Sequence, residues 1–138
     1  MAQDYSIIIG TVGQGLGVSS DAGETWTKIR QPIPSEATVR ALGVYPDNPH
    51  RILAGSDVGI FRSDDNGTTW EKLDSPFDDL QIWSVALDPT NTETIFAGTR
   101  PESYRSRDGG KSWDKLNMGV NMECPIGAPR TNNMIEDP

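Results

Sequence analysis

Residues 63–70, Ser-Asp-Asp-Asn-Gly-Thr-Thr-Trp (SDDNGTTW), decide the fold of this chain, because their pattern occurs three times. Residues 19–26 read SSDAGETW and residues 106–113 read SRDGGKSW, so all three copies fit S-x-D-x-G-x-[ST]-W without a gap. Successive copies are 44 and 43 residues apart. A period of this length is typical of stacked supersecondary units. The chain is therefore predicted to be an array of about three similar units.

The repeat extends beyond this pattern. At a shift of 43 residues, 82–87 (IWSVAL) align with 39–44 (VRALGV), and 94–98 (TIFAG) align with 51–55 (RILAG). Each unit reads as four short β-type runs separated by Asp-Pro, Asn-Pro, Gly and Asp-x-Gly turns. No helical period of comparable length appears. We therefore predict an all-β fold of β-propeller blades, each with four antiparallel strands.

The chain is predicted to be a single propeller segment, residues 1–138, with about three blades. The predicted blade strands lie within residues 5–30, 39–73 and 82–116, and a final innermost strand lies near 131–137. The first of these ranges holds only three strands. Closed propellers contain 4 to 8 blades. The ring is therefore expected to close only by oligomerisation or through sequence that this chain does not contain.

Two explanations of the incomplete ring remain open. In the first, the chain forms a symmetric homo-oligomer, most simply a six-bladed dimer, in which the final strand of one copy completes the first blade of another. In the second, the chain is a truncated piece of a six- to eight-bladed protein.

The repeated pattern has a physical explanation. Gly23, Gly67 and Gly110 supply a backbone that tolerates positive φ where the chain must reverse. The aspartate of each copy is predicted to accept hydrogen bonds from backbone N–H groups of that turn. The tryptophan is large enough to fill the space between neighbouring sheets. The structural residues of the pattern are therefore predicted to be Asp21, Asp65, Asp108, Trp26, Trp70 and Trp113.

On these residues the chain resembles the Asp-box, or BNR, repeat proteins, which include sialidase-like, sortilin-like and xyloglucanase-like propellers. The resemblance covers residues 5 to about 116. It implies that the Asp boxes are structural turns at the periphery, away from the central pocket. It does not identify one activity, because such propellers include glycosidases, receptors and assembly factors.

Composition narrows the range of partners and cofactors. The net charge is −8, with 12 basic and 20 acidic residues, and the basic residues are scattered. Nucleic acid and anionic membranes are therefore not expected as partners. A single cysteine, Cys124, and a single histidine, His50, argue against a disulfide, a cysteine-rich metal site and a histidine-based triad. We predict no metal and no cofactor. Taken as a natural N-terminus, the start of the chain carries no signal peptide, which predicts a cytoplasmic protein.

Ligand contacts in a propeller are expected from the innermost strand and from the connection between the second and third strands. The candidate ligand-binding residues in these places are Arg40, Trp83, Gln14 and Arg100. Asp57 lies where the resemblance to xyloglucanase-type propellers implies a catalytic aspartate. Because glycoside hydrolysis requires two carboxyl groups, Glu102 is its candidate catalytic partner.

The sequence therefore favours a binding or scaffolding module for a carbohydrate or protein ligand, without enzymatic activity of its own. A fragment of a propeller glycoside hydrolase and a self-assembling homo-oligomeric propeller are the alternatives.

Overall fold

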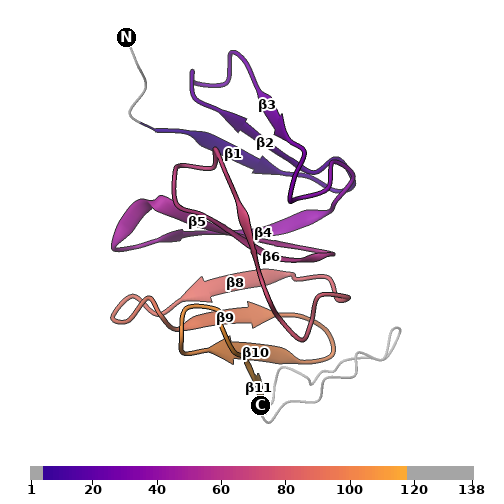
Figure 1. The fold of residues 1–138 in the computed structure, drawn as a ribbon, viewed down its shortest axis with the longest axis vertical. Coiled ribbons are helices and arrows are strands. Elements are labelled where there is room, and N and C mark those ends of the chain that lie inside the picture. The colour runs from indigo at the N-terminus through magenta and orange to yellow at the C-terminus, as the bar shows by residue number, and fades with distance from the viewer. Residues whose placement is uncertain (1–4, 118–138) are drawn as a thin grey trace, which may run out of the picture.

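The computed structural model describes residues 5–117 and shows three antiparallel sheets stacked in chain order (Figure 1). The first sheet has the order β1 (Ile7–Gly10), β2 (Leu16–Ser19), β3 (Thr27–Ile29). The second has the order β4 (Val39–Tyr45), β5 (Asn48–Ser56), β6 (Gly59–Ser63), β7 (Glu71–Leu73). The third runs, from inner to outer strand, β8 (Ser84–Leu87), β9 (Ile95–Gly98), β10 (Ser103–Ser106), β11 (Asp114–Leu116).

The predicted all-β, propeller-type fold is confirmed, and the three sheets do not close into a ring. Residues 5–117 contain no helix, and so none that could cross a membrane. Within the described part of the chain, the first sheet has three strands and its β1 pairs with β2 alone. The predicted final strand near 131–137 lies outside the residues that the structure describes.

Strand alternation directs side chains into two separate cores. In the second sheet, Ile52 and Phe61 face the first sheet, whereas Leu53 and Ile60 face the third. Successive residues of a strand point to opposite faces, so one sheet supplies both cores. The run from Ile52 to Ser56 is consequently buried throughout, as expected for a strand covered on both faces.

The tryptophans of the second and third Asp boxes face the preceding sheet. Trp70 lies in the core between the first and second sheets and is 8% exposed. Trp113 packs edge-on against Phe77 at 5.0 Å, and its indole Nε1 donates to the Asp74 carbonyl at 3.0 Å. All three tryptophans were predicted to pack between blades, but Trp26 does not, since it is 44% exposed. Its sheet has no preceding sheet within residues 5–117.

The three Asp boxes share one hydrogen-bond pattern. In the second box, the Thr69 backbone N–H donates to Asp65 Oδ1 at 2.8 Å, and the Thr69 hydroxyl donates to Oδ2 at 2.6 Å. The Ser63 hydroxyl donates to Asp65 Oδ1 at 2.9 Å and accepts from the Gly67 N–H at 2.8 Å. The same bonds recur around Asp21 and Asp108. The glycine of each box has a positive φ, between 89° and 97°.

These hydrogen bonds favour the ionised aspartate. Hydrogen bonds from the Thr25 hydroxyl and N–H lower the pKa of Asp21 to about 2, and those from Ser112 lower the pKa of Asp108 to about 2. At Asp65 burial works in the opposite direction, but the bonds from Thr69 and Ser63 outweigh it and the pKa is lowered. A carboxylate with several donors holds its charge more strongly in the folded chain than in the unfolded one.

We predict acid destabilisation through these carboxylates. Their stabilising effect is fully present above the unfolded pKa of about 3.8, and it is lost as the pH falls toward the folded value of about 2. Urea unfolding between pH 5 and pH 2 should therefore show a falling midpoint. Asp108→Asn should reduce the slope of this fall. Asp79→Asn, an exposed carboxylate outside the Asp boxes, should leave it unchanged. An Asp108→Asn profile parallel to wild type would contradict this assignment.

We also predict that Trp70 contributes much more to stability than an exposed tryptophan. Trp70→Ala should lower the free energy of unfolding by about 3–5 kcal/mol, because it leaves a cavity between two sheets. Trp83→Ala, which removes an indole that is 54% exposed, should cost far less. Denaturant unfolding of both variants checks the difference, and equal losses would show that Trp70 does not join the sheets.

Candidate functional site

Two candidate ligand-binding residues meet where the innermost strands of the second and third sheets lie side by side. The guanidinium carbon of Arg40, on β4, lies 4.5 Å from the ring centroid of Trp83, directly before β8. The indole is 54% exposed. Arg40 and Trp83 occupy the same position in successive units, so neighbouring sheets bring them together. A cation–π contact at an exposed site contributes about 0.5–1 kcal/mol.

Asp57 forms hydrogen bonds with the backbone of Thr38, directly before the innermost strand β4. Its Oδ1 accepts from the Thr38 N–H at 3.1 Å, and its own N–H donates to the Thr38 carbonyl at 3.1 Å. Gln81 Nε2 donates to the Thr38 carbonyl at 3.4 Å and to the Ile82 carbonyl at 3.0 Å. Thr38 and Gln81 each lie two residues before a member of the Arg40–Trp83 pair. We call Thr38, Arg40, Asp57, Gln81 and Trp83 the inner-edge cluster.

Gln81 was not predicted from the sequence as a site residue. The signal that could have found it is the repeat itself, since Gln81 and Thr38 are equivalent positions 43 residues apart. Equivalent positions of adjacent blades lie next to each other when the blades stack.

A turn that contains candidate site residues follows each of β1, β5 and β9. A hydroxyl group at the end of the strand stabilises each of these turns. The Thr11 hydroxyl donates to the Gly15 carbonyl at 2.7 Å and accepts from the Gln14 N–H at 3.0 Å. Ser56 does the same with Gly59 and Val58, at 2.9 and 3.1 Å. The Thr99 hydroxyl donates to the Glu102 carbonyl. These three residues were also not predicted, although each unit has Ser or Thr at this position.

The remaining candidates lie apart from the inner-edge cluster. Glu102 pairs with Lys115 Nζ at 3.2 Å and accepts from the Tyr104 hydroxyl at 3.4 Å. Within residues 5–117, no hydrogen bond or ion pair joins Glu102 to Asp57. Arg100 is exposed in the connection between β9 and β10. Gln14 borders a hollow beside the first sheet, together with Ile9 and Trp26.

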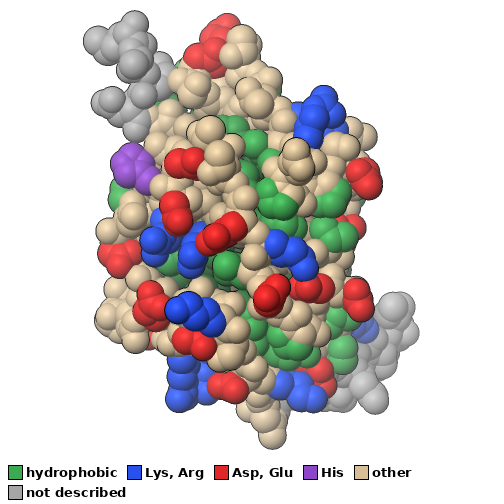
Figure 2. All heavy atoms as spheres, viewed as in Figure 1, with side chains coloured by type: hydrophobic (Ala, Val, Ile, Leu, Met, Phe, Trp, Pro, Cys, Tyr) green, Lys and Arg blue, Asp and Glu red, His purple; other side chains and the backbone are tan. Residues whose placement is uncertain are grey.

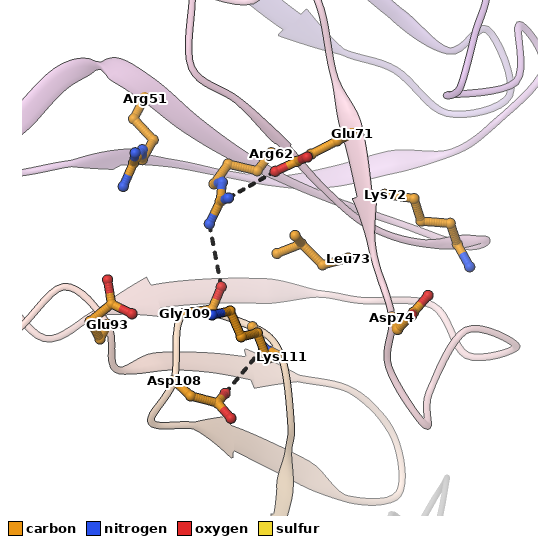
Figure 3. Close-up of a pocket in the computed structure, with 11 residues that line it drawn as sticks. Arg51, Arg62, Glu71, Lys72, Leu73, Asp74, Glu93, Asp108, Gly109 and Lys111 are labelled. Atoms are coloured by element: carbon orange, nitrogen blue, oxygen red, sulfur yellow. Dashed lines mark hydrogen bonds and ion pairs between the residues drawn. The ribbon is translucent and has the colours of Figure 1, made fainter.

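A cavity of about 500 Å³ lies at the outer rim between the second and third sheets (Figure 3). Its charged lining includes both signs: Arg51, Arg62, Lys72 and Lys111 with Glu71, Asp74, Glu93 and Asp108. Arg62 spans the two sheets, because its Nη1 donates to the Gly109 carbonyl at 3.3 Å and its Nη2 pairs with Glu71 at 2.8 Å. This rim cavity contains none of the predicted ligand-binding or catalytic residues. We regard its polar contacts as connections between blades.

Charges of both signs are interspersed over the face shown in Figure 2. Across residues 5–117, no three His, Cys, Asp or Glu side chains gather in a way that could hold a metal ion. The inner-edge cluster offers a sugar or another polar ligand three groups: the indole of Trp83, the guanidinium of Arg40 and the carboxylate of Asp57.

Comparison with known proteins identifies the repeats. The family model described as BNR/Asp-box repeat matches residues 61–72 and 104–115. A xyloglucanase of Hypocrea jecorina is 34% identical over 65 residues, or 47% of this chain. A probable oligoxyloglucan-reducing end-specific xyloglucanase of Neosartorya fischeri is 33% identical over 69 residues, or 44% of this chain. Each match spans only 8% of the relative's own length.

Solved structures give the same fold. An ancestral GH74 enzyme matches with a TM-score of 0.69 at 21% identity, covering 86% of this chain and 18% of that protein's chain. YCF48 bound to D1 peptide matches with a TM-score of 0.61 at 18% identity, covering 83% of this chain and 39% of that one. At these identities the likeness concerns the fold alone. The chain thus has the fold of a β-propeller segment, and the second and third of its Asp boxes lie within the BNR/Asp-box repeat matches.

Proposed function

We propose that this chain is part of a propeller that binds a polysaccharide of the xyloglucan type at the inner edge of its blades. The observation that carries this proposal is the exposed Trp83 indole, which stacks with Arg40. Thr38, two residues before Arg40, bonds to Asp57, and Gln81, two residues before Trp83, bonds to Thr38. The two xyloglucanases that match about half of the chain support a carbohydrate as the ligand.

Binding would depend on Trp83 and Arg40 together. The guanidinium lies over part of the indole, and Trp83 is still 54% exposed, which leaves ring surface accessible to a ligand. An aromatic face packs well against the apolar C–H face of a sugar ring. The five N–H donors of the guanidinium suit the hydroxyl groups at the sugar's edge. The pair therefore offers complementary apolar and polar contacts to one sugar unit.

Asp57 would supply one carboxyl group of a hydrolytic pair. The Thr38 N–H fixes its Oδ1, so that the carboxylate has a defined orientation at the turn between β5 and β6. Hydrolysis needs a second carboxyl group, about 5–5.5 Å away for retention of configuration or about 6.5–9.5 Å away for inversion. The partner would be Glu102, or a carboxyl group of a more complete propeller. We therefore propose ligand binding by this chain and hydrolysis only where that pair is complete.

A titration with xyloglucan oligosaccharides tests the binding surface. We expect saturable binding by the wild-type chain, measured by calorimetry, and about tenfold weaker binding by Trp83→Ala, because a lost aromatic contact of about 1.4 kcal/mol corresponds to that factor. Leu42→Ala, which truncates an apolar side chain of β4 that is 40% exposed, is the matched control and should bind normally. Equal affinities of Trp83→Ala and wild type would reject the surface. Absence of binding to any oligosaccharide would favour a protein ligand instead.

The role of Asp57 is tested separately, by release of reducing ends from xyloglucan. Asp57→Asn keeps an oxygen that can accept from the Thr38 N–H, so that oligosaccharide binding should be retained. Any hydrolysis by the wild-type chain should fall at least about a hundredfold, the usual scale for a positioned acid or base. Hydrolysis at the wild-type rate in Asp57→Asn would remove this residue from the mechanism.

A further inference from the structure

Among the residues that the structure describes, no sheet lies against one apolar face of the first sheet. Its residues Ile8, Leu16, Val18 and Ile29 face the second sheet. The opposite face carries Ile9, Gly17, Trp26 and Lys28, which we call the Trp26 face. Ile9 is 45% exposed and Trp26 is 44% exposed. Two large apolar side chains are therefore accessible side by side on one face.

The repeat shows what covers this face elsewhere in the chain. Ile9 is equivalent to Ala54 and Ala97, which are 0% and 1% exposed. Trp26 is equivalent to Trp70, which is 8% exposed. These buried residues all pack on the preceding sheet. The Trp26 face therefore has the residue types and positions of a blade interface.

The shape of the Trp26 face indicates what the covering surface must provide. Gly17 occupies the position of Phe61 in the second sheet and Tyr104 in the third. Gly17 lies in a hollow of about 310 Å³ that is also bordered by Ile9, Trp26 and Lys28, and the Trp26 ring lies next to it. A covering sheet must insert a bulky side chain there to pack without a void.

The far face of the third sheet has such a side chain. Phe96 stands where the second sheet has Leu53, and it belongs to neither core. Its cross-strand partner is Arg105, just as Leu53 pairs with Arg62. Phe96 is larger than the leucine that it replaces. This difference matches the hollow that Gly17 borders.

The position of Arg105 also favours the packing of a further sheet on the far face of the third sheet. Its equivalent, Arg62, reaches the Asp-box turn of the following sheet and donates to the Gly109 carbonyl at 3.3 Å (Figure 3). The Nε of Arg105 is buried without a hydrogen-bond partner, as is the Nε of Arg62, so the two arginines have similar surroundings within their own sheets. The position equivalent to Gly109 in the first sheet is Ala22, which has a similar positive φ of 62° against 75°. The Ala22 carbonyl of a following sheet would thus be a suitable acceptor for the Arg105 guanidinium.

We propose that the far face of the third sheet packs on the Trp26 face of a second copy of this chain, and reciprocally. Phe96 inserts over Gly17 beside Trp26, and Arg105 donates to the Ala22 carbonyl. The contact repeats the interface between the second and third sheets of the same chain. Two copies of three sheets then form a closed six-bladed ring, within the range of 4 to 8 blades. This interaction is face-to-face packing, and it requires no exchange of strands.

Light scattering coupled to gel filtration tests the proposal on the full chain. Wild type should have twice the monomer mass. Trp26→Glu and Phe96→Glu should each be monomeric, because each change places a charge in both interfaces of the ring. An equimolar mixture of the two variants should regain a dimer. One interface is then unmodified, formed by the Phe96 face of the first variant and the Trp26 face of the second. This dimer should dissociate more readily than wild type.

Val44→Glu is the control, since it places the same charge on a 58% exposed side chain outside both faces. It should remain dimeric. Circular dichroism identifies variants that fail to fold, and Trp26→Ser and Phe96→Ser, which add no charge, then replace them. A monomeric wild type would overturn the proposal, as would folded variants that stay monomeric when mixed. It would also be overturned if Phe96→Glu remained dimeric while Trp26→Glu did not, because the Trp26 faces would then pack on each other.

Discussion

The structure depends on one constraint, the hydrogen-bonded turn of the Asp box. An ionised aspartate accepts from the backbone and the hydroxyl of a residue four positions later, while a serine hydroxyl two positions earlier completes the turn. The bonds close within eight residues and need no partner from another sheet. Each turn therefore sets the geometry between the last two strands of its blade by local forces. The same geometry places the tryptophan that follows, and thus links a local turn to packing between sheets.

Packing between the sheets follows a directional rule. The indoles of Trp70 and Trp113 face the preceding sheet, so a blade has two unlike faces, and an open stack of blades leaves one face of each kind uncovered. The middle sheet is covered on both faces and has the longest buried run, whereas the first sheet leaves Trp26 accessible. Arg62 adds a polar connection at the rim, where it bonds to both a glutamate of its own sheet and a carbonyl of the next. Apolar packing and charged rim contacts therefore join the same pair of blades.

The candidate ligand-binding residues lie at positions where the repeats differ in sequence. Residues that recur in every unit, such as the Asp-box aspartates and the hydroxyls of Thr11, Ser56 and Thr99, hold turns. Residues that differ at equivalent positions, such as Arg40 and Trp83, lie at the inner edge and contact each other. The stacking of blades brings equivalent positions side by side, so two different side chains at equivalent positions of neighbouring blades form one surface. A regular scaffold can in this way carry an irregular site.

The sequence by itself determined the fold class, the approximate strand positions and the structural role of the Asp boxes, because each depends on interactions within about forty residues. It also identified Arg40, Trp83 and Asp57 as candidates from their positions in the repeat. Only the tertiary structure decided that Arg40 stacks on Trp83, that Thr38 connects Asp57 with Gln81, and that Glu102 pairs with Lys115. It also decided that Trp26 is exposed while Trp70 is buried. These outcomes depend on which sheet lies against which face. A local pattern that is the same in all three units carries no information about its neighbours.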